Sequence, residues 1–151
     1  MNAYQMMNLL MEIRDAWGWI GINPAEIIDQ NDFGNLLIRD EDGKYWRLCP
    51  EGVYCEVIAK DQIELAGLTN DSKFLDDWRM SALLKAARNK IGILDEGKVY
   101  CLTIPGALGG AYDISNVKAV PLVELIRFSG DLGKQILDLP DGEQVQLKMI
   151  D

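Results

Sequence analysis

Apolar residues at helical spacing open the chain. Between residues 3 and 17 they recur every three or four positions: Met6, Leu9, Leu10, Ile13 and Trp17. This spacing places them on one face of an amphipathic helix. Gly18 and Gly21 follow, and glycine commonly occupies the position just past a helix end. The pattern therefore predicts a helix over residues 3–17 whose apolar face packs on the core.

The pattern changes to short β-prone runs in the next part of the chain. Two such runs, 36–39 and 45–49, flank an Asp-Gly pair, which is a strong hairpin signal. A third run, 53–59, follows a Pro-Glu-Gly turn. Together they predict an antiparallel meander over residues 35–59.

Helical spacing then returns, on one face of a segment that ends near Gly92: Met80, Leu83, Leu84, Ala87 and Ile91. Residues 68–79, just before it, are expected to be a loop or a short helix. Residues 99–104 are apolar on both faces, which is typical of a strand in the centre of a sheet. Pro121 is placed to begin a further helix, because proline favours the first helical position. Residues 143–150 alternate apolar and polar side chains, which predicts a final strand.

These patterns predict the α+β class in one domain over residues 1–151. Its sheet is mainly antiparallel, with the meander at 35–59 and strands near 99–104 and 143–150. An N-terminal helix and two further helices would pack on it. A chain of this length can bury roughly two thirds of its unfolded surface, enough for a sizeable core.

The formal net charge of −9 argues against two classes of binding partner. Nucleic acid and anionic membranes both attract Lys and Arg, so an acidic protein is expected to bind neither. A basic protein partner is favoured instead, although acidity can also serve solubility alone. Glu12 and Asp15 interrupt the first apolar segment, and no run approaches the roughly 20 apolar residues of a membrane span. We therefore expect a cytoplasmic protein.

The sequence contains few residues that could catalyse a reaction or bind a metal. The chain has no histidine, which removes the commonest general base and His-bearing metal sites. Its three cysteines, Cys49, Cys55 and Cys101, lack metal-site spacing and fall in apolar runs. Reduced, buried thiols are the expected state. We predict no catalytic residue, no metal, no cofactor and no enzymatic activity.

The glycine-rich stretch "IPGALGGAYDISNV" at 104–117 is the one candidate for a phosphate-binding loop. It lacks the lysine and hydroxyl of a Walker loop and is followed by β-like residues rather than directly by a helix. Gly109 and Gly110 are better explained by positive φ angles and a close backbone approach. We predict a corner between two strands.

The stretches 31–51 and 104–126 also carry a family resemblance. Over about residues 25–130 the chain resembles a bacterial family of unknown function that is associated with the C-terminal part of immunity proteins for type VI secretion DNase effectors. That family often follows a GAD-like domain. A weaker similarity is to SUKH-type immunity proteins. The resemblance implies a non-catalytic protein that binds and neutralises a cognate toxin, and it implies no catalytic residues.

Two places are candidates for contact with such a partner. Asp40, Glu41 and Asp42 are predicted at an exposed hairpin tip, and Tyr112 and Asp113 follow the glycine corner. The tip could equally be a solvated turn, Tyr112 a core residue and Asp113 a turn cap. A second hypothesis for the function stays open, namely a small-molecule-binding or regulatory domain with a pocket beside the glycine corner.

Overall fold

The computed structural model describes residues 1–137 and 139, beginning with the helix α1 (Ala3–Trp17). This helix is confirmed with the predicted bounds. Asn2 and Gln5 form a capping box, in which each side chain accepts a hydrogen bond from the other's backbone N–H. The predicted apolar face is the buried one, with Ile13 and Trp17 at most 1% exposed. The single-turn helix η1 (Gly18–Ile20) follows.

The main sheet is a four-stranded antiparallel meander. Its strands are β1 (Pro24–Gln30), β2 (Leu36–Asp40), β3 (Tyr45–Cys49) and β4 (Tyr54–Ala59), in that spatial order. The meander predicted at 35–59 is confirmed as β2–β4. The edge strand β1 was not predicted, because it begins with proline and most of its side chains are at least partly exposed, so no clean alternation marks it.

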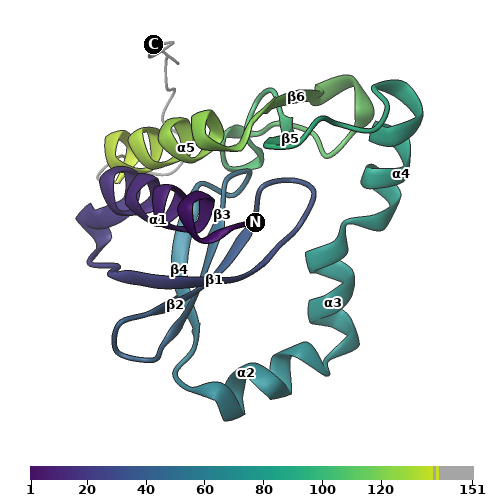
Figure 1. Cartoon of the computed structure of the whole chain (residues 1–151). Coiled ribbons are helices and arrows are strands. Elements are labelled where there is room, and N and C mark those ends of the chain that lie inside the picture. Colours follow the sequence, from purple (N-terminus) through teal and green to yellow (C-terminus); the bar gives the residue numbers. More distant parts are fainter. Residues whose placement is uncertain (138, 140–151) are drawn as a thin grey trace.

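Three helices run beside the sheet as an arm: α2 (Gln62–Thr69), α3 (Ser72–Arg79) and α4 (Ser81–Lys90) (Figure 1). The helix predicted near 80–91 is confirmed as α4. The uncertain segment before it is helical, since Asp71 caps the start of α3. Met80, with a φ angle of 48°, makes the sharp corner between α3 and α4. Trp78 of the arm packs against Leu37 and Tyr45 of the sheet.

The strand predicted at 99–104 is β5 (Lys98–Leu102), and it is buried as expected. Its predicted central place in the sheet is wrong. It pairs with β6 (Val117–Pro121) in a separate two-stranded sheet. The helix α5 (Leu122–Ile136) begins directly after Pro121, as predicted. β5 is apolar on both faces because Val99 and Cys101 pack in the core with α5, while Tyr100 packs with Phe33 of the β1–β2 loop and Ala87 of α4.

The core lies between the four-stranded sheet and the helix pair α1 and α5, which lie side by side (Figure 1). Gly130 allows this close approach, because a Cβ there would stand 2.4 Å from the carbonyl oxygen of Ala16. Arg127 of α5 donates two hydrogen bonds to Glu12 of α1 across the pair. The described residues thus contain four α-helices besides α1, against the two further helices predicted. The strand predicted at 143–150 lies outside them.

Candidate functional site

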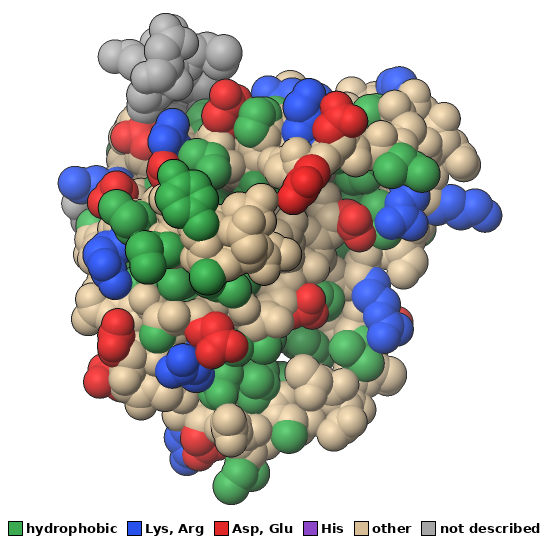
Figure 2. Space-filling view, viewed as in Figure 1, with side chains coloured by type: hydrophobic (Ala, Val, Ile, Leu, Met, Phe, Trp, Pro, Cys, Tyr) green, Lys and Arg blue, Asp and Glu red, His purple; other side chains and the backbone are tan. Residues whose placement is uncertain are grey.

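An open groove of about 580 Å³ lies beside the glycine corner. We call it the corner groove. The β3–β4 turn, the α3–α4 corner and the segment after Gly110 form its walls. Six side chains that line it carry charge or an aromatic ring: Arg47, Glu51, Tyr54, Asp76, Asp77 and Tyr112. Charge alone would not have located it, since acidic and basic side chains are interspersed over the face shown in Figure 2.

A buried polar network supports the corner groove. Asn35 is 0% exposed, and its Nδ2 donates to both carboxylate oxygens of Glu51 at 3.0 and 2.9 Å. The Oδ1 of the same side chain accepts from Nε of Arg47 at 3.1 Å. Arg47 continues the network, because its Nη1 donates to Oδ2 of Asp77 at 2.6 Å. One neutral amide thereby links a buried cation to a buried anion.

A second asparagine ties this network to the helical arm. Asn31 Nδ2 donates to the backbone carbonyl of Trp78 at 2.8 Å, and its Oδ1 accepts from the backbone of Phe33 and Asn35. The guanidinium of Arg47 also lies 5.2 Å from the centroid of the Trp78 ring. Sequence reasoning missed this network. The available signal was Arg47 inside the apolar run "YWRLC", preceded by the asparagine pair of "NDFGN".

Burial holds the three cysteine thiols in their neutral forms. Burial, with the charge of Glu51 added, raises the pKa of Cys49 to about 12. Burial likewise raises the pKa of Cys55 to about 12 and that of Cys101 to about 11. All three cysteines are free and buried, as predicted. Protonated thiols are poor nucleophiles, so these cysteines are packing residues rather than reactive ones.

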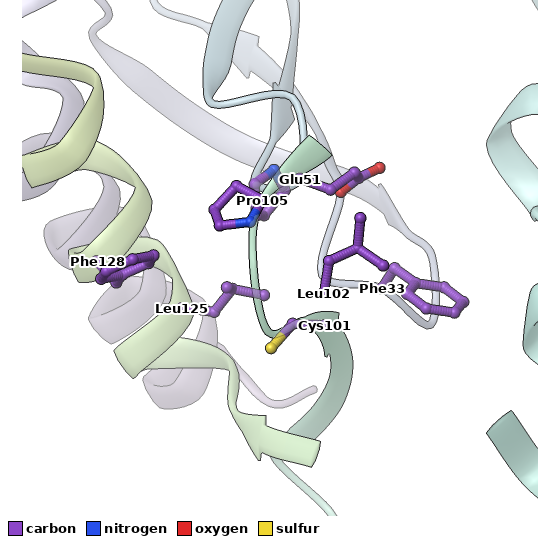
Figure 3. Close-up of a pocket in the computed structure, with 8 residues that line it drawn as sticks. Phe33, Glu51, Cys101, Leu102, Pro105, Leu125 and Phe128 are labelled. Atoms are coloured by element: carbon purple, nitrogen blue, oxygen red, sulfur yellow. The ribbon is translucent and has the colours of Figure 1, made fainter. Parts of the chain in front are cut away.

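A small space of about 10 Å³ shares Glu51 with the groove and is lined by Leu125 and Phe128 (Figure 3). It has room for about one water molecule, which excludes an organic ligand. In the part of the chain that the structure describes, no cluster of three or more acidic or Cys side chains is arranged to hold a metal ion. Of these two spaces, the corner groove is the one with room for another molecule.

Comparison with known protein families matches a segment that forms part of this groove's wall. Residues 64–133 match the family described as T6SS immunity protein Tdi1, C-terminal. The chain carries a Tdi1-type segment. This match confirms the resemblance noted for 104–126, while the stretch 31–51 lies outside the matched residues. The weaker similarity to SUKH proteins stays a prediction. The Tdi1-type segment runs from α2 into α5 and supplies the α3–α4 corner and Tyr112.

The fold has a solved counterpart. It is similar to the "Crystal structure of Atu4351 from Agrobacterium tumefaciens", with a TM-score of 0.55 and 16% sequence identity. The match covers 82% of this chain and 63% of that chain, so the protein spans less than two thirds of its counterpart's length. At this identity the likeness shows the fold alone. No curated protein matches the chain.

The predicted acidic tip lies outside the Tdi1-type segment, and the structure corrects one of its residues. Asp40 is 3% exposed, so its predicted exposure is wrong. Its carboxylate turns inward, accepting hydrogen bonds from the backbone of Asp42 and Lys44 and from Nε1 of Trp46. Glu41 and Asp42 are exposed. Reversing all three charges would therefore break the turn, whereas Glu41 and Asp42 can be reversed without touching this network.

The hydrogen bonds of Asp40 predict a pH-dependent stability. Burial alone would raise its pKa, but the bonds from Trp46, Lys44 and Asp42 prevail and lower it. We expect Asp40→Asn to destabilise the protein by roughly 1–2 kcal/mol at pH 7, since hydrogen bonds to a charged acceptor are the stronger ones. Because the pKa of Asp40 is lower in the folded state, its carboxylate stabilises the fold at pH values above the unfolded-state pKa of about 4. This stabilisation is lost as the pH falls through the folded-state pKa. In urea unfolding, the stability difference between the wild type and Asp40→Asn should be smaller at pH 3 than at pH 7. A constant difference would contradict this account.

The two candidates after the glycine corner have different environments. Tyr112 is 57% exposed, lines the corner groove and rests its ring against Gly106, where a Cβ would stand 2.7 Å from the ring. Asp113 is exposed and caps the short helix η3 (Ile114–Asn116), accepting a hydrogen bond from the backbone of Ser115. The structure thus places Tyr112 in the groove wall. Neither Asp113 nor the exposed tip residues are among the side chains lining it.

Proposed function

We propose that this protein is a non-catalytic immunity protein that binds and neutralises a cognate type VI secretion toxin in the cytoplasm. The match of residues 64–133 to a T6SS immunity family carries this proposal. The family resemblance suggests a nuclease as the toxin. A nuclease needs basic surface to hold nucleic acid, and a protein of net charge −9 can occupy that surface by electrostatic complementarity. Among the described residues, none of the helices is long and apolar enough to cross a membrane.

A titration tests both the binding and the absence of catalysis. The probe is the product of the toxin-sized reading frame expected beside this gene, produced with and without the protein. We expect growth to be protected, a stable complex in size-exclusion chromatography, and toxin activity that falls linearly to zero at one molar equivalent. Protection at far below one equivalent would contradict the non-catalytic part of the proposal. Absence of both complex and protection would contradict the immunity role.

Glu41 and Asp42 remain a proposed part of the contact surface. Their double reversal, Glu41→Lys with Asp42→Lys, should slow association at low salt, because complementary charge at an interface rim acts mainly on the on-rate. The effect should fade at high salt, where the Debye length shortens. An on-rate unaltered at low salt would place the contact elsewhere.

A second candidate function is supported by the corner groove itself. Its volume of about 580 Å³ falls within the range of small-molecule sites, and it lies beside the glycine corner. A metabolite that raises the melting temperature of the wild type but not of Tyr112→Ala, in a protein that binds no toxin, would favour this alternative.

A further inference from the structure

The corner groove has an excess of negative charge. Three carboxylates line it, those of Glu51, Asp76 and Asp77, against the single cation Arg47. The side chain of Arg47 is only 7% exposed, and its guanidinium already donates to Asn35 and Asp77. Asp77, by contrast, is 69% exposed at the rim. A molecule entering the groove therefore meets carboxylates rather than a free cation.

Glu51 is the unusual member of this set. It is 7% exposed, and its carboxylate oxygens accept hydrogen bonds from the neutral amide of Asn35. Within residues 1–137 and 139, no Lys or Arg nitrogen comes within ion-pair distance of it. Its carboxylate points away from the apolar Leu125 and Phe128 (Figure 3). A buried anion without a cationic partner is costly, so a positive group placed in the groove would be bound favourably.

Aromatic and apolar side chains complete a site for a long cationic side chain. Tyr54 and Tyr112 line the groove with the apolar Met80 and Leu83. Tyrosine faces attract cations within about 6 Å, and guanidinium groups are the commonest partners. Burial, followed by the charge of Glu51, raises the pKa of Tyr112 to about 12.

We infer that the corner groove binds an arginine-bearing segment of the toxin, a conclusion that rests on the proposed function. The guanidinium lies among Glu51, Asp76 and Asp77, and the methylene stem packs on the tyrosine rings. The same charges exclude a phosphate or other anionic ligand. Most of the arginine's contacts come from two walls, the Tdi1-type segment and the β3–β4 turn, so the site exists only when both are in place.

The test uses two short peptides and needs no toxin. Acetyl-Gly-Arg-Gly-amide and its citrulline counterpart, which is neutral but of nearly the same shape, are titrated into the isotope-labelled protein. We expect saturable NMR shifts at the amides of Tyr112 and Leu83, with an affinity for the arginine peptide on the order of tenfold higher. Equal affinities, shifts located elsewhere, or no saturable shift would overturn the inference.

A matched pair of variants separates local contact from net charge. Asp76→Lys and Glu124→Lys change the charge equally, but Asp76 lines the groove and Glu124 lies exposed on α5, outside its lining. Only Asp76→Lys should abolish the arginine shifts, and Tyr112→Ala should weaken them. Loss of binding in both lysine variants would indicate a general charge effect and overturn the site.

The toxin then distinguishes the two proposals. If wild-type protein neutralises the toxin and Asp76→Lys does so equally well, the groove inference fails while the immunity function stands. If wild-type protein gives no complex, the immunity function fails, and the peptide titration alone decides whether the groove binds arginine.

Discussion

Replacing Asn35 by leucine is expected to lower the free energy of unfolding by about 3–5 kcal/mol. The side chain is fully buried and satisfies Arg47 on one side and Glu51 on the other. Leucine has nearly the same size but no polar atoms, so the variant strands a buried guanidinium nitrogen and a buried carboxylate together. Urea unfolding followed by circular dichroism measures the loss.

Two variants control this experiment. Asn89→Leu makes the same change at an exposed position of α4 and should alter stability by no more than about 0.5 kcal/mol. Adding Glu51→Leu to Asn35→Leu removes the stranded carboxylate and should recover part of the loss, because apolar groups tolerate burial. A loss below about 1 kcal/mol for Asn35→Leu would show that water satisfies the network and that Asn35 is dispensable.

Valine at Gly110 is expected to cost about 3 kcal/mol or more, above the roughly 1–3 kcal/mol expected for valine at Gly109. The two glycines are needed for different reasons. Gly109 has a φ angle of 89° with open space around its Cβ position. At Gly110 a Cβ would stand 1.7 Å from the carbonyl oxygen of Ile104, a backbone atom that cannot move without opening the corner.

Asparagine distinguishes the two mechanisms, because it tolerates the left-handed region better than other residues with a side chain. Gly109→Asn should therefore lose much less stability than Gly109→Val. Gly110→Asn should be as damaging as Gly110→Val, since any Cβ meets the same oxygen. Equal tolerance of asparagine at both positions, judged by urea midpoints, would refute the close-approach explanation for Gly110.

Elements whose evidence is local were predictable from sequence. Helix α1 has a cap, an apolar stripe and a glycine end within one segment, and the β2–β3 hairpin has its Asp-Gly turn. The glycine corner was also predictable as a link between two strands, with the positive φ found at Gly109. The second of these strands, β6, was predicted only as a β-like run before Pro121, because five residues beside a proline carry too short a pattern to give its bounds.

Burial was easier to predict than the partner that causes it. Residues 99–102 are apolar on both faces, which sequence reasoning assigned to a central strand. In the structure two helices and a loop cover them, and an apolar pattern cannot distinguish these surroundings from neighbouring strands. For Asp40 the burial itself was mispredicted. Its place in a hairpin turn suggested an exposed side chain, but its carboxylate accepts hydrogen bonds from the backbone of Asp42 and from Nε1 of Trp46.

The sequence alone determined the α+β class, the acidic charge, the absence of histidine and the resemblance to an immunity family. These follow from composition and from patterns within short segments. The three-dimensional structure was needed to find that Asn35, Arg47 and Glu51 form one network, and that Asp76 and Tyr112 line the same groove. Asp76 and Tyr112 are far apart in the chain, and Arg47 reaches the distant Asp77. Their proximity depends on how the helical arm and the glycine corner pack against the sheet, and a pattern of neighbouring residues does not encode that packing.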